Sequence, residues 1–173
     1  MKTKCMYRML PAALVIMLSA GCDGLLSPDP DIPGRIYFNS FELSTDTVGW
    51  RGYAGIQIVR DAPSPGGLLS ARVSGGCIVP HAYADIPGPH EDSYLVLGCW
   101  GKNLSHGGGL SLSLTRTPQN SIRVSITDTV WTAYASGDTL FCPAGDSLHI
   151  EMMSGGILAS AMLVDLLEIR SVR

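Results

Sequence analysis

LSLSL at residues 110–114 and IRVSI at residues 122–126 are two stretches in which apolar and polar residues alternate strictly. A period of two is that of a β-strand with one face in a core and the other in water. LHIEM at residues 148–152 repeats the pattern. YLVLGCW at residues 94–100 is a near-continuous apolar run, which is typical of a strand buried on both faces. The sequence therefore predicts a strand at each of these four places.

Clusters of proline and glycine separate the predicted strands, and such clusters mark turns. They are PSPGG at 63–67, GG at 75–76, PGP at 87–89, GGG at 107–109, PAG at 143–145 and GG at 155–156. Many short strands with this punctuation predict an all-β sandwich or barrel. Residues 157–169 are ambiguous, because their alanine, leucine and methionine favour a helix by propensity while their periodicity decides nothing.

The beginning of the chain has the order of a secretory signal peptide: basic residues, an apolar run over 10–20, then small residues. Its end, LSAGC at 18–22, resembles a bacterial lipoprotein lipobox, although Leu18 lies four rather than three places before the cysteine. The resemblance implies cleavage after Gly21 and lipidation of Cys22. The alternatives are an ordinary signal peptide and a transmembrane anchor. The apolar run is about half of the ~20 residues that a spanning helix needs, which disfavours the anchor.

We expect three regions along the chain. Residues 1–21 are the lipoprotein signal peptide, residues 22–34 are the lipidated Cys22 with a flexible tether, and residues 35–173 form one folded domain. The tether contains three prolines in DGLLSPDPDIPG, which disfavour a helix and favour an extended chain. This organisation predicts a cell-envelope protein that is held to a bacterial membrane by its lipid alone, with the domain outside the cytoplasm. Which membrane stays open.

The charge of the mature chain argues against a nucleic-acid partner. Removal of residues 1–21 leaves nine of the twelve basic residues against fifteen acidic ones, a formal charge of −6. Lys102 is then the only lysine, and no basic stripe exists.

Three cysteines besides Cys22 remain in an oxidising compartment: Cys77, Cys99 and Cys142. They allow at most one internal disulfide and leave one thiol over. Cys77 and Cys99 are equidistant from Gly88, so they would lie opposite each other if the flanking strands formed a simple hairpin. This symmetry favours a Cys77–Cys99 disulfide with Cys142 free and buried. The wide spacing disfavours a zinc site.

An ordered set of short segments resembles carbohydrate-binding modules of the family 4/9 type, within the galactose-binding-like jelly rolls. The segments are FNSFE at 38–42, GW at 49–50, GGLLSARV at 66–73, WGK at 100–102, WTAY at 131–134, LFCPAG at 140–145 and LVDLLEI at 163–169. The resemblance covers residues 36–171. It implies a jelly-roll β-sandwich of two antiparallel sheets, a closing strand at 163–169 and glycan binding without catalysis.

The resemblance also implies a structural Ca²⁺ between the first and last strands, with Glu42 and Asp165 at the matching positions. Calcium prefers hard oxygen ligands of this kind. Leu166 stands where a second aspartate is common, which weakens the site. The alternative is that Glu42 and Asp165 are polar residues at strand ends. No other cofactor is indicated.

Sugar binding needs exposed aromatic faces beside polar groups, because a ring stacks on the apolar C–H face of a pyranose. The candidate ligand-binding residues are Trp50, Tyr53, Tyr83, Trp100 and Tyr134. If Leu95, Leu97 and Cys99 face the core, Trp100 points to the other side of its strand. We expect Trp131 to support the fold, and core or rim packing is the alternative for all these rings.

Catalytic motifs are weak. GDSL at 145–148 matches the tetrapeptide of an esterase family, but no Asp-x-x-His follows it to supply a base. The four histidines lack metal-ligand spacing, and no pair of glutamates suggests glycosidase chemistry. The sequence therefore predicts a non-enzymatic protein that binds a ligand, most simply a glycan. The alternative is a structural or protein-interaction domain, and a hydrolase comes third.

Overall fold

The computed structural model describes residues 32–52, 55–75, 82–155 and 159–172. Cys22, the signal peptide, most of the tether, Tyr53 and Cys77 lie outside the described residues. The elements within them are β1 (Arg35–Asn39), the 3₁₀-helix η1 (Ser44–Thr47), β2 (Ile56–Val59), β3 (Ser70–Ser74), β4 (Ala82–Pro87), β5 (Ser93–Ser105), β6 (Gly108–Leu114), β7 (Ser121–Ile126), β8 (Thr132–Ala135), β9 (Leu140–Cys142), β10 (Ser147–Ser154) and β11 (Ala161–Val172). No helix in these ranges is long and apolar enough to span a membrane.

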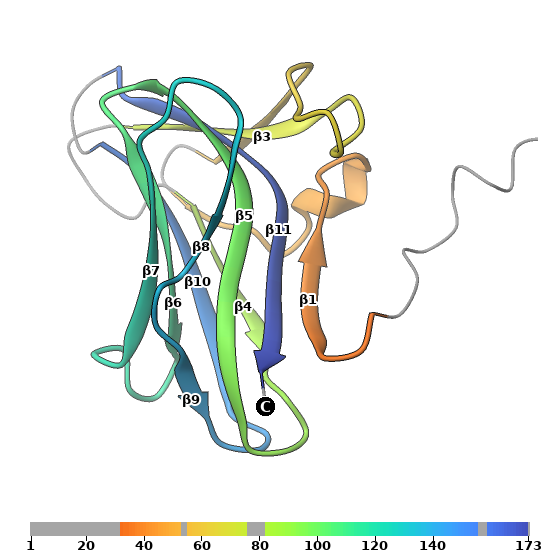
Figure 1. Cartoon of the computed structure of the whole chain (residues 1–173), viewed down its shortest axis with the longest axis vertical. Helices are drawn as coiled ribbons and strands as arrows, with labels where there is room; N and C mark the ends of the chain where they lie inside the picture. Colours follow the sequence, from red (N-terminus) through yellow and green to blue (C-terminus); the bar gives the residue numbers. More distant parts are fainter. Residues whose placement is uncertain (1–31, 53–54, 76–81, 156–158, 173) are drawn as a thin grey trace, which may run out of the picture. The chain divides into compact units, whose positions relative to one another are not determined.

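The described strands form two antiparallel sheets that face each other, which confirms the predicted jelly-roll β-sandwich (Figure 1). The seven-stranded sheet has the order β2-β3-β11-β5-β8, with β1 paired to β11 and β9 paired to β5. The four-stranded sheet has the order β4-β10-β6-β7. Strands β6, β7 and β10 contain the three alternating stretches, so the period-two prediction is confirmed for each.

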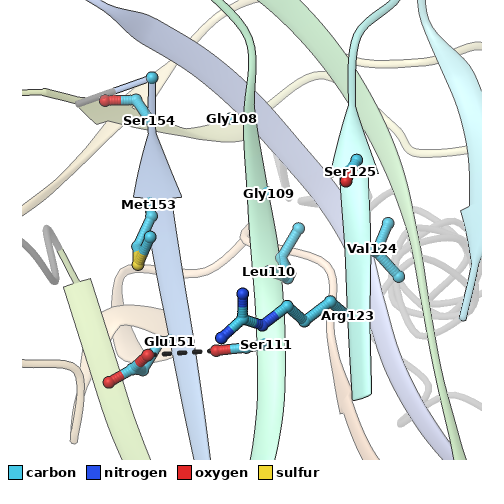
Figure 2. A pocket seen from close by; sticks show the side chains of 11 residues that line it. Gly108, Gly109, Leu110, Ser111, Arg123, Val124, Ser125, Glu151, Met153 and Ser154 are labelled. Atoms are coloured by element: carbon cyan, nitrogen blue, oxygen red, sulfur yellow. Dashed lines mark hydrogen bonds between the residues drawn. The ribbon is translucent and has the colours of Figure 1, made fainter. Parts of the chain in front are cut away.

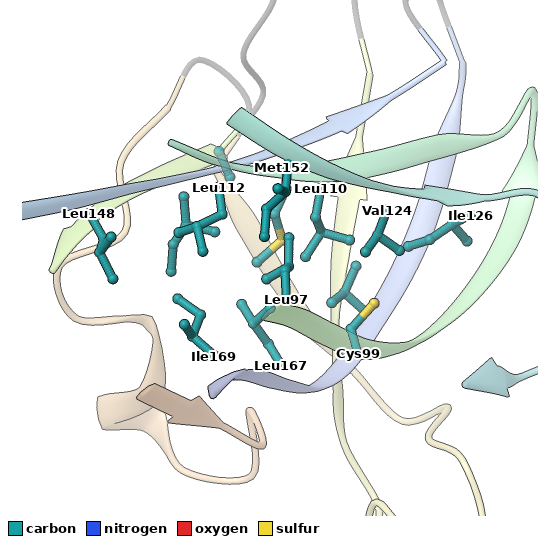
Figure 3. Close-up of a cluster of buried hydrophobic side chains, with 14 of the residues drawn as sticks. Leu97, Cys99, Leu110, Leu112, Val124, Ile126, Leu148, Met152, Leu167 and Ile169 are labelled. Carbon is teal, nitrogen blue, oxygen red and sulfur yellow. The ribbon is translucent and has the colours of Figure 1, made fainter. Parts of the chain in front are cut away.

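The core lies between the two sheets. Figure 3 shows Leu97 of β5 and Leu167 of β11 pointing toward Leu110, Leu112 and Met152 of the four-stranded sheet. All five side chains are at most 2% exposed. Burying a side chain of this size contributes roughly 1.5–3 kcal/mol to folding, so these five side chains help to hold the two sheets together.

Strand β5 is not buried on both faces, contrary to the expectation for residues 94–100. Its burial alternates, with Leu95, Leu97 and Cys99 in the core and Tyr94 54% exposed on the other face. The reason is that only the face carrying Leu95, Leu97 and Cys99 packs against the four-stranded sheet. Trp100 lies on the outer face of β5, as predicted.

The ambiguous segment near the end of the chain is strand β11, which confirms the predicted closing strand. It pairs with β1, β3 and β5 and so lies at the centre of the seven-stranded sheet. Its register with β5 shifts between Asp165 and Glu168. Leu166, within the shift, has a φ of 46°, a left-handed conformation that is uncommon for leucine.

The hairpin assumed for the Cys77–Cys99 disulfide is wrong. Strand β4, before Gly88, belongs to the four-stranded sheet, whereas β5, after it, belongs to the seven-stranded sheet. The chain crosses from one sheet to the other at this point, so symmetry about Gly88 brings no residues face to face. Cys99 and Cys142 are both free and buried in the structure, and Cys77 lies outside the described residues. Burial raises the pKa of Cys99 to about 12.

Candidate functional site

The outer face of the four-stranded sheet carries a row of polar and aromatic residues in cross-strand register. Tyr83 of β4 is the partner of Glu151 of β10, which is the partner of Ser111 of β6, which is the partner of Arg123 of β7. An isolated bridge adds Arg51 beside Tyr83 at the end of this row. Directly opposed residues point to the same face of a sheet. The row therefore places a carboxylate between two guanidinium groups across the whole width of the sheet.

Hydrogen bonds hold the middle of this row in place. Ser111 Oγ donates to Glu151 Oε2 at 3.1 Å, and Glu151 Oε1 lies 3.3 Å from His149 Nε2. The other ring nitrogen of His149, Nδ1, lies 2.6 Å from Asp85 Oδ1. The Tyr83 ring packs on the imidazole, with centroids 5.5 Å apart. The carboxylate of Glu151 is thus oriented from two sides before any ligand arrives.

A cavity of about 360 Å³ adjoins the row (Figure 2). Figure 2 shows Arg123 reaching from β7 over Ser111 toward Glu151, with Met153 on the neighbouring strand. Gly109 lies between Met153 and Ser125 in the next row, and a Cβ there would collide with the carbonyl oxygen of Val124. A glycine is therefore required at this position. It leaves the gap between Met153 and Ser125 without a side chain.

The chemistry of this face suits a ligand rich in hydroxyl groups. Carboxylates accept hydrogen bonds from hydroxyls, guanidinium groups donate to them, and an aromatic ring covers an apolar C–H face. The cavity volume lies within the range of small-molecule sites. Within the described ranges, no hydrogen bond joins Ser147 of the GDSL stretch to a histidine, and its backbone N–H donates to Asp146 Oδ1 at 2.8 Å.

Of the aromatic residues predicted to bind ligand, Tyr83 lies on this face, and two others are packed into the structure. Trp50 is half-buried against the core, with its ring 6.3 Å from that of Phe41. Tyr134 also packs against the core. Its hydroxyl accepts the backbone N–H of Asp128 at 3.0 Å and donates to that residue's Oδ2 at 2.9 Å. Trp50 and Tyr134 thus order neighbouring loops.

The remaining predicted aromatic residues are elsewhere. Trp100 is the cross-strand partner of Asp165 on the outer face of the seven-stranded sheet, and Tyr53 lies outside the described residues. Of the predicted aromatic residues that the structure describes, Trp50, Trp100 and Tyr134 therefore do not gather around Tyr83.

Sequence reasoning missed the other members of the row. Glu151 and Arg123 are the polar positions of the alternating stretches at 148–152 and 122–126. Such positions look like any solvated strand face, and only the register between strands shows that they adjoin one cavity.

The structure brings together the two residues predicted to bind calcium. Glu42 Oε1 accepts the backbone N–H groups of Leu68 at 2.8 Å and Leu69 at 2.6 Å. The adjacent glycines of this loop pack on both carboxylates, Gly66 on Asp165 and Gly67 on Glu42. The loop between β2 and β3 thus packs against both acidic side chains.

The donor set fits a hard cation. Asp165 is fully buried, and its Oδ2 has no hydrogen-bond partner within the described part of the chain. Burial raises the pKa of Asp165 to about 7, against the opposing effect of a hydrogen bond from the Leu166 N–H, and the charge of Glu42 raises it further. A divalent cation would remove the repulsion between Glu42 and Asp165, and Asp165 Oδ2 would coordinate it. No group of three or more acidic, histidine or cysteine side chains gathers among the described residues, so backbone oxygens would have to complete the coordination.

Among solved structures, several carbohydrate-binding modules share the fold of this chain. No protein-family model matches the chain, and no curated protein matches it. The xylan-binding family 22 module CBM22-1 of Paenibacillus barcinonensis Xyn10C matches with a TM-score of 0.56 and 18% identity, covering 80% of this chain and 95% of that domain. The tandem of this module with CBM22-2 matches with a TM-score of 0.57 and 17% identity, covering 80% of this chain and 46% of the tandem.

The C-terminal family 22 carbohydrate-binding module of Clostridium thermocellum Xyn10B matches with a TM-score of 0.53 and 12% identity, covering 82% of this chain and 97% of that one. These identities show a shared fold. Membership of family 4/9 stays a prediction.

Proposed function

We propose that this protein is a non-catalytic lipoprotein of the cell envelope whose β-sandwich binds a glycan on the outer face of the four-stranded sheet. The observation that carries the proposal is the row from Arg51 through Tyr83, Glu151 and Ser111 to Arg123, beside a cavity of about 360 Å³. The fold is that of the xylan-binding domain matched above, which supports a saccharide as the ligand. The lipid on Cys22 would hold the domain at the membrane while it binds.

Each residue of the row has a role in this proposal. Glu151, fixed by Ser111 and His149, accepts hydrogen bonds from sugar hydroxyls. Arg123 and Arg51 donate from the two ends, and neither forms an ion pair within the described residues. The Tyr83 ring supplies the apolar contact. An open row across a whole sheet suits several successive sugar units of one chain.

We also propose that Glu42 and Asp165 hold a structural Ca²⁺. The ion would neutralise two carboxylates that the β2–β3 loop brings together, and it would tie β11 to the segment after β1. It supplies stability and takes no part in ligand binding, because both residues lie on the seven-stranded sheet's side of the molecule.

One observation favours a second function, that of a structural or protein-interaction domain. Among the described aromatic candidates, Tyr83 alone lies on the proposed binding face. A face with few rings stacks sugars weakly, and the same charged row would then serve as a contact with another envelope protein.

A glycan array with the Cys22→Ser chain, followed by calorimetry on the hits, separates the two functions. The Glu151→Gln and Arg123→Gln variants should each weaken binding about tenfold or more, as loss of a charged hydrogen bond predicts. Arg72→Gln is the matched control, because Arg72 is an exposed arginine on the other sheet. No binding to any glycan by the folded wild type, or equal losses in all three variants, would contradict the proposed groove.

A further inference from the structure

A pair of aromatic rings is exposed on the opposite side of the sandwich from the proposed groove. Tyr94 of β5 and Phe141 of β9 are cross-strand partners, 54% and 46% exposed, with ring centroids 5.3 Å apart. Val172 of β11 is the partner of Tyr94 on its other side and is 38% exposed. This aromatic pair lies on the outer face of the seven-stranded sheet, at the end where β9 and the last residues of β11 flank β5 (Figure 1).

A cavity of about 630 Å³ adjoins the pair and has Phe141 in its wall. Its apolar floor is formed by Leu114, Ile122 and Leu140, which also belong to the core. Its polar lining comes from the β6–β7 turn and the segments around β9, namely Arg116, Thr117, Gln119, Asn120, Thr139 and Asp146.

The polar groups at this cavity have hydrogen-bonding capacity to spare. Arg116 Nε and Asp146 Oδ1 form a long ion pair at 3.8 Å, and the same carboxylate oxygen accepts the backbone N–H of Ser147 at 2.8 Å, which leaves the guanidinium free to donate to a ligand. The side-chain amides of Gln119 and Asn120 make no hydrogen bond within the described ranges, and both are exposed. Amides, a carboxylate and a guanidinium beside an exposed ring are the groups that recognise sugar hydroxyls and the C–H face of a pyranose. An acyl chain or an apolar helix would make no use of these polar groups.

We infer that the aromatic pair and its cavity form a second saccharide-binding site, for a short neutral glycan or the end of one. The inference rests on the proposed function only for the class of ligand, since the lining of this cavity and the aromatic pair share no residue with the groove. Two separate sites would let one domain hold a polysaccharide at two points, which raises the apparent affinity for a polymer above that for a short oligosaccharide.

The test is a glycan array of neutral oligosaccharides, probed with the Cys22→Ser chain, its Glu151→Gln variant and its Phe141→Leu variant. Leucine keeps the apolar character at position 141 and removes the ring, so it separates stacking from general hydrophobic contact. We expect Glu151→Gln to keep residual binding and the double variant to lose about tenfold more. Val48→Ala, at an exposed apolar position elsewhere, should change nothing.

Each outcome decides between the two sites. Complete loss of binding in Glu151→Gln alone would overturn the second site and leave the groove standing. Loss in Phe141→Leu with none in Glu151→Gln would support the second site and overturn the groove. No binding by the wild type overturns both. Binding to phosphatidylcholine vesicles or self-association that Phe141→Leu retains and Phe141→Ser loses would show a lipid or protein contact instead. Equal melting midpoints, within about 4 °C, would show that the variants are folded, because Phe141 is half exposed.

Discussion

The indole N–H of Trp131 donates a hydrogen bond of 2.8 Å to Asp61 Oδ1, joining two residues that are 70 positions apart in the chain. Lys102 Nζ of β5 donates to the other oxygen of the same carboxylate at 2.7 Å. Asp61 therefore ties the loop before β3 to β5 and to the start of β8. These contacts give Trp131 a role in the fold, in agreement with the sequence-based expectation.

Replacing Trp131 should lower stability without altering the glycan groove. Trp131→Phe removes the N–H and keeps a ring, so its cost should be about 1.5–3 kcal/mol, as for a hydrogen bond to a charged group. Trp131→Ala also loses packing, but it should cost less than the ~3–5 kcal/mol of a fully buried tryptophan because the side chain is only half-buried. Urea unfolding measures both. Unchanged stability together with lost glycan binding would show that Trp131 is a ligand residue.

The Asp61 cluster should also make stability depend on acid pH. Burial alone would raise the pKa of Asp61, but the hydrogen bonds from Lys102 and Trp131 hold it below its ordinary value. A carboxyl with a lowered pKa in the folded state contributes stability above its unfolded pKa of about 3.9 and loses it as pH falls through the folded-state pKa. Asp61→Asn should therefore destabilise the protein at pH 7 and much less at pH 3. Equal destabilisation at both pH values would rule out this linkage.

Calcium should stabilise the folded chain. A ligand that binds only the folded state contributes about 2.7 kcal/mol at one hundred times its dissociation constant, so the unfolding midpoint should rise with Ca²⁺ and fall with a chelator. Asp165→Asn should abolish the difference, while Asp138→Asn, at an exposed position, should keep it. If neither Ca²⁺ nor a chelator changes the unfolding midpoint of the wild type, the site does not bind calcium. The presence of Leu166 in place of a second aspartate would then explain the loss.

Alkylation followed by mass spectrometry of the non-reduced peptides shows which cysteines are free and which are in a disulfide. Cys99 and Cys142 are free and buried, and burial raises the pKa of both thiols, so neither should react with iodoacetamide at pH 8 in the native protein. Both should react in denaturant without a reductant. A non-reduced peptide that links Cys77 to Cys99 would instead restore the predicted disulfide.

The period of two in β6, β7 and β10 predicted the fold class because it depends on local chemistry alone. The crossing between β4 and β5 could not be predicted in this way. PGP at 87–89 marks a break in the chain, and the same residues allow either a hairpin or a change of sheet. The decision comes from the packing of the two sheets, which no local pattern contains.

The candidate site was predicted only in part for the same reason. Glu42 and Asp165 could be paired because a family resemblance linked two distant segments. Glu151 and Arg123 had no such link, and they adjoin one cavity only through the register of β10, β6 and β7. Trp50 and Tyr134 were favoured as aromatic residues, but the size that suits a ring for stacking also suits it for packing against the core.

Lipidation at Cys22 is the prediction on which the cellular role depends. It rests on the apolar run over 10–20 and on LSAGC at 18–22, which lie outside the described residues. A Cys22→Ala protein expressed in a bacterium should lose metabolic acyl label and leave the membrane fraction, because an acyl chain contributes about 0.8 kcal/mol per buried CH₂ to membrane binding. Cys99→Ala is the matched control and should keep both the label and the membrane fraction. Membrane partition that persists without Cys22 would mean that another part of the chain makes the attachment.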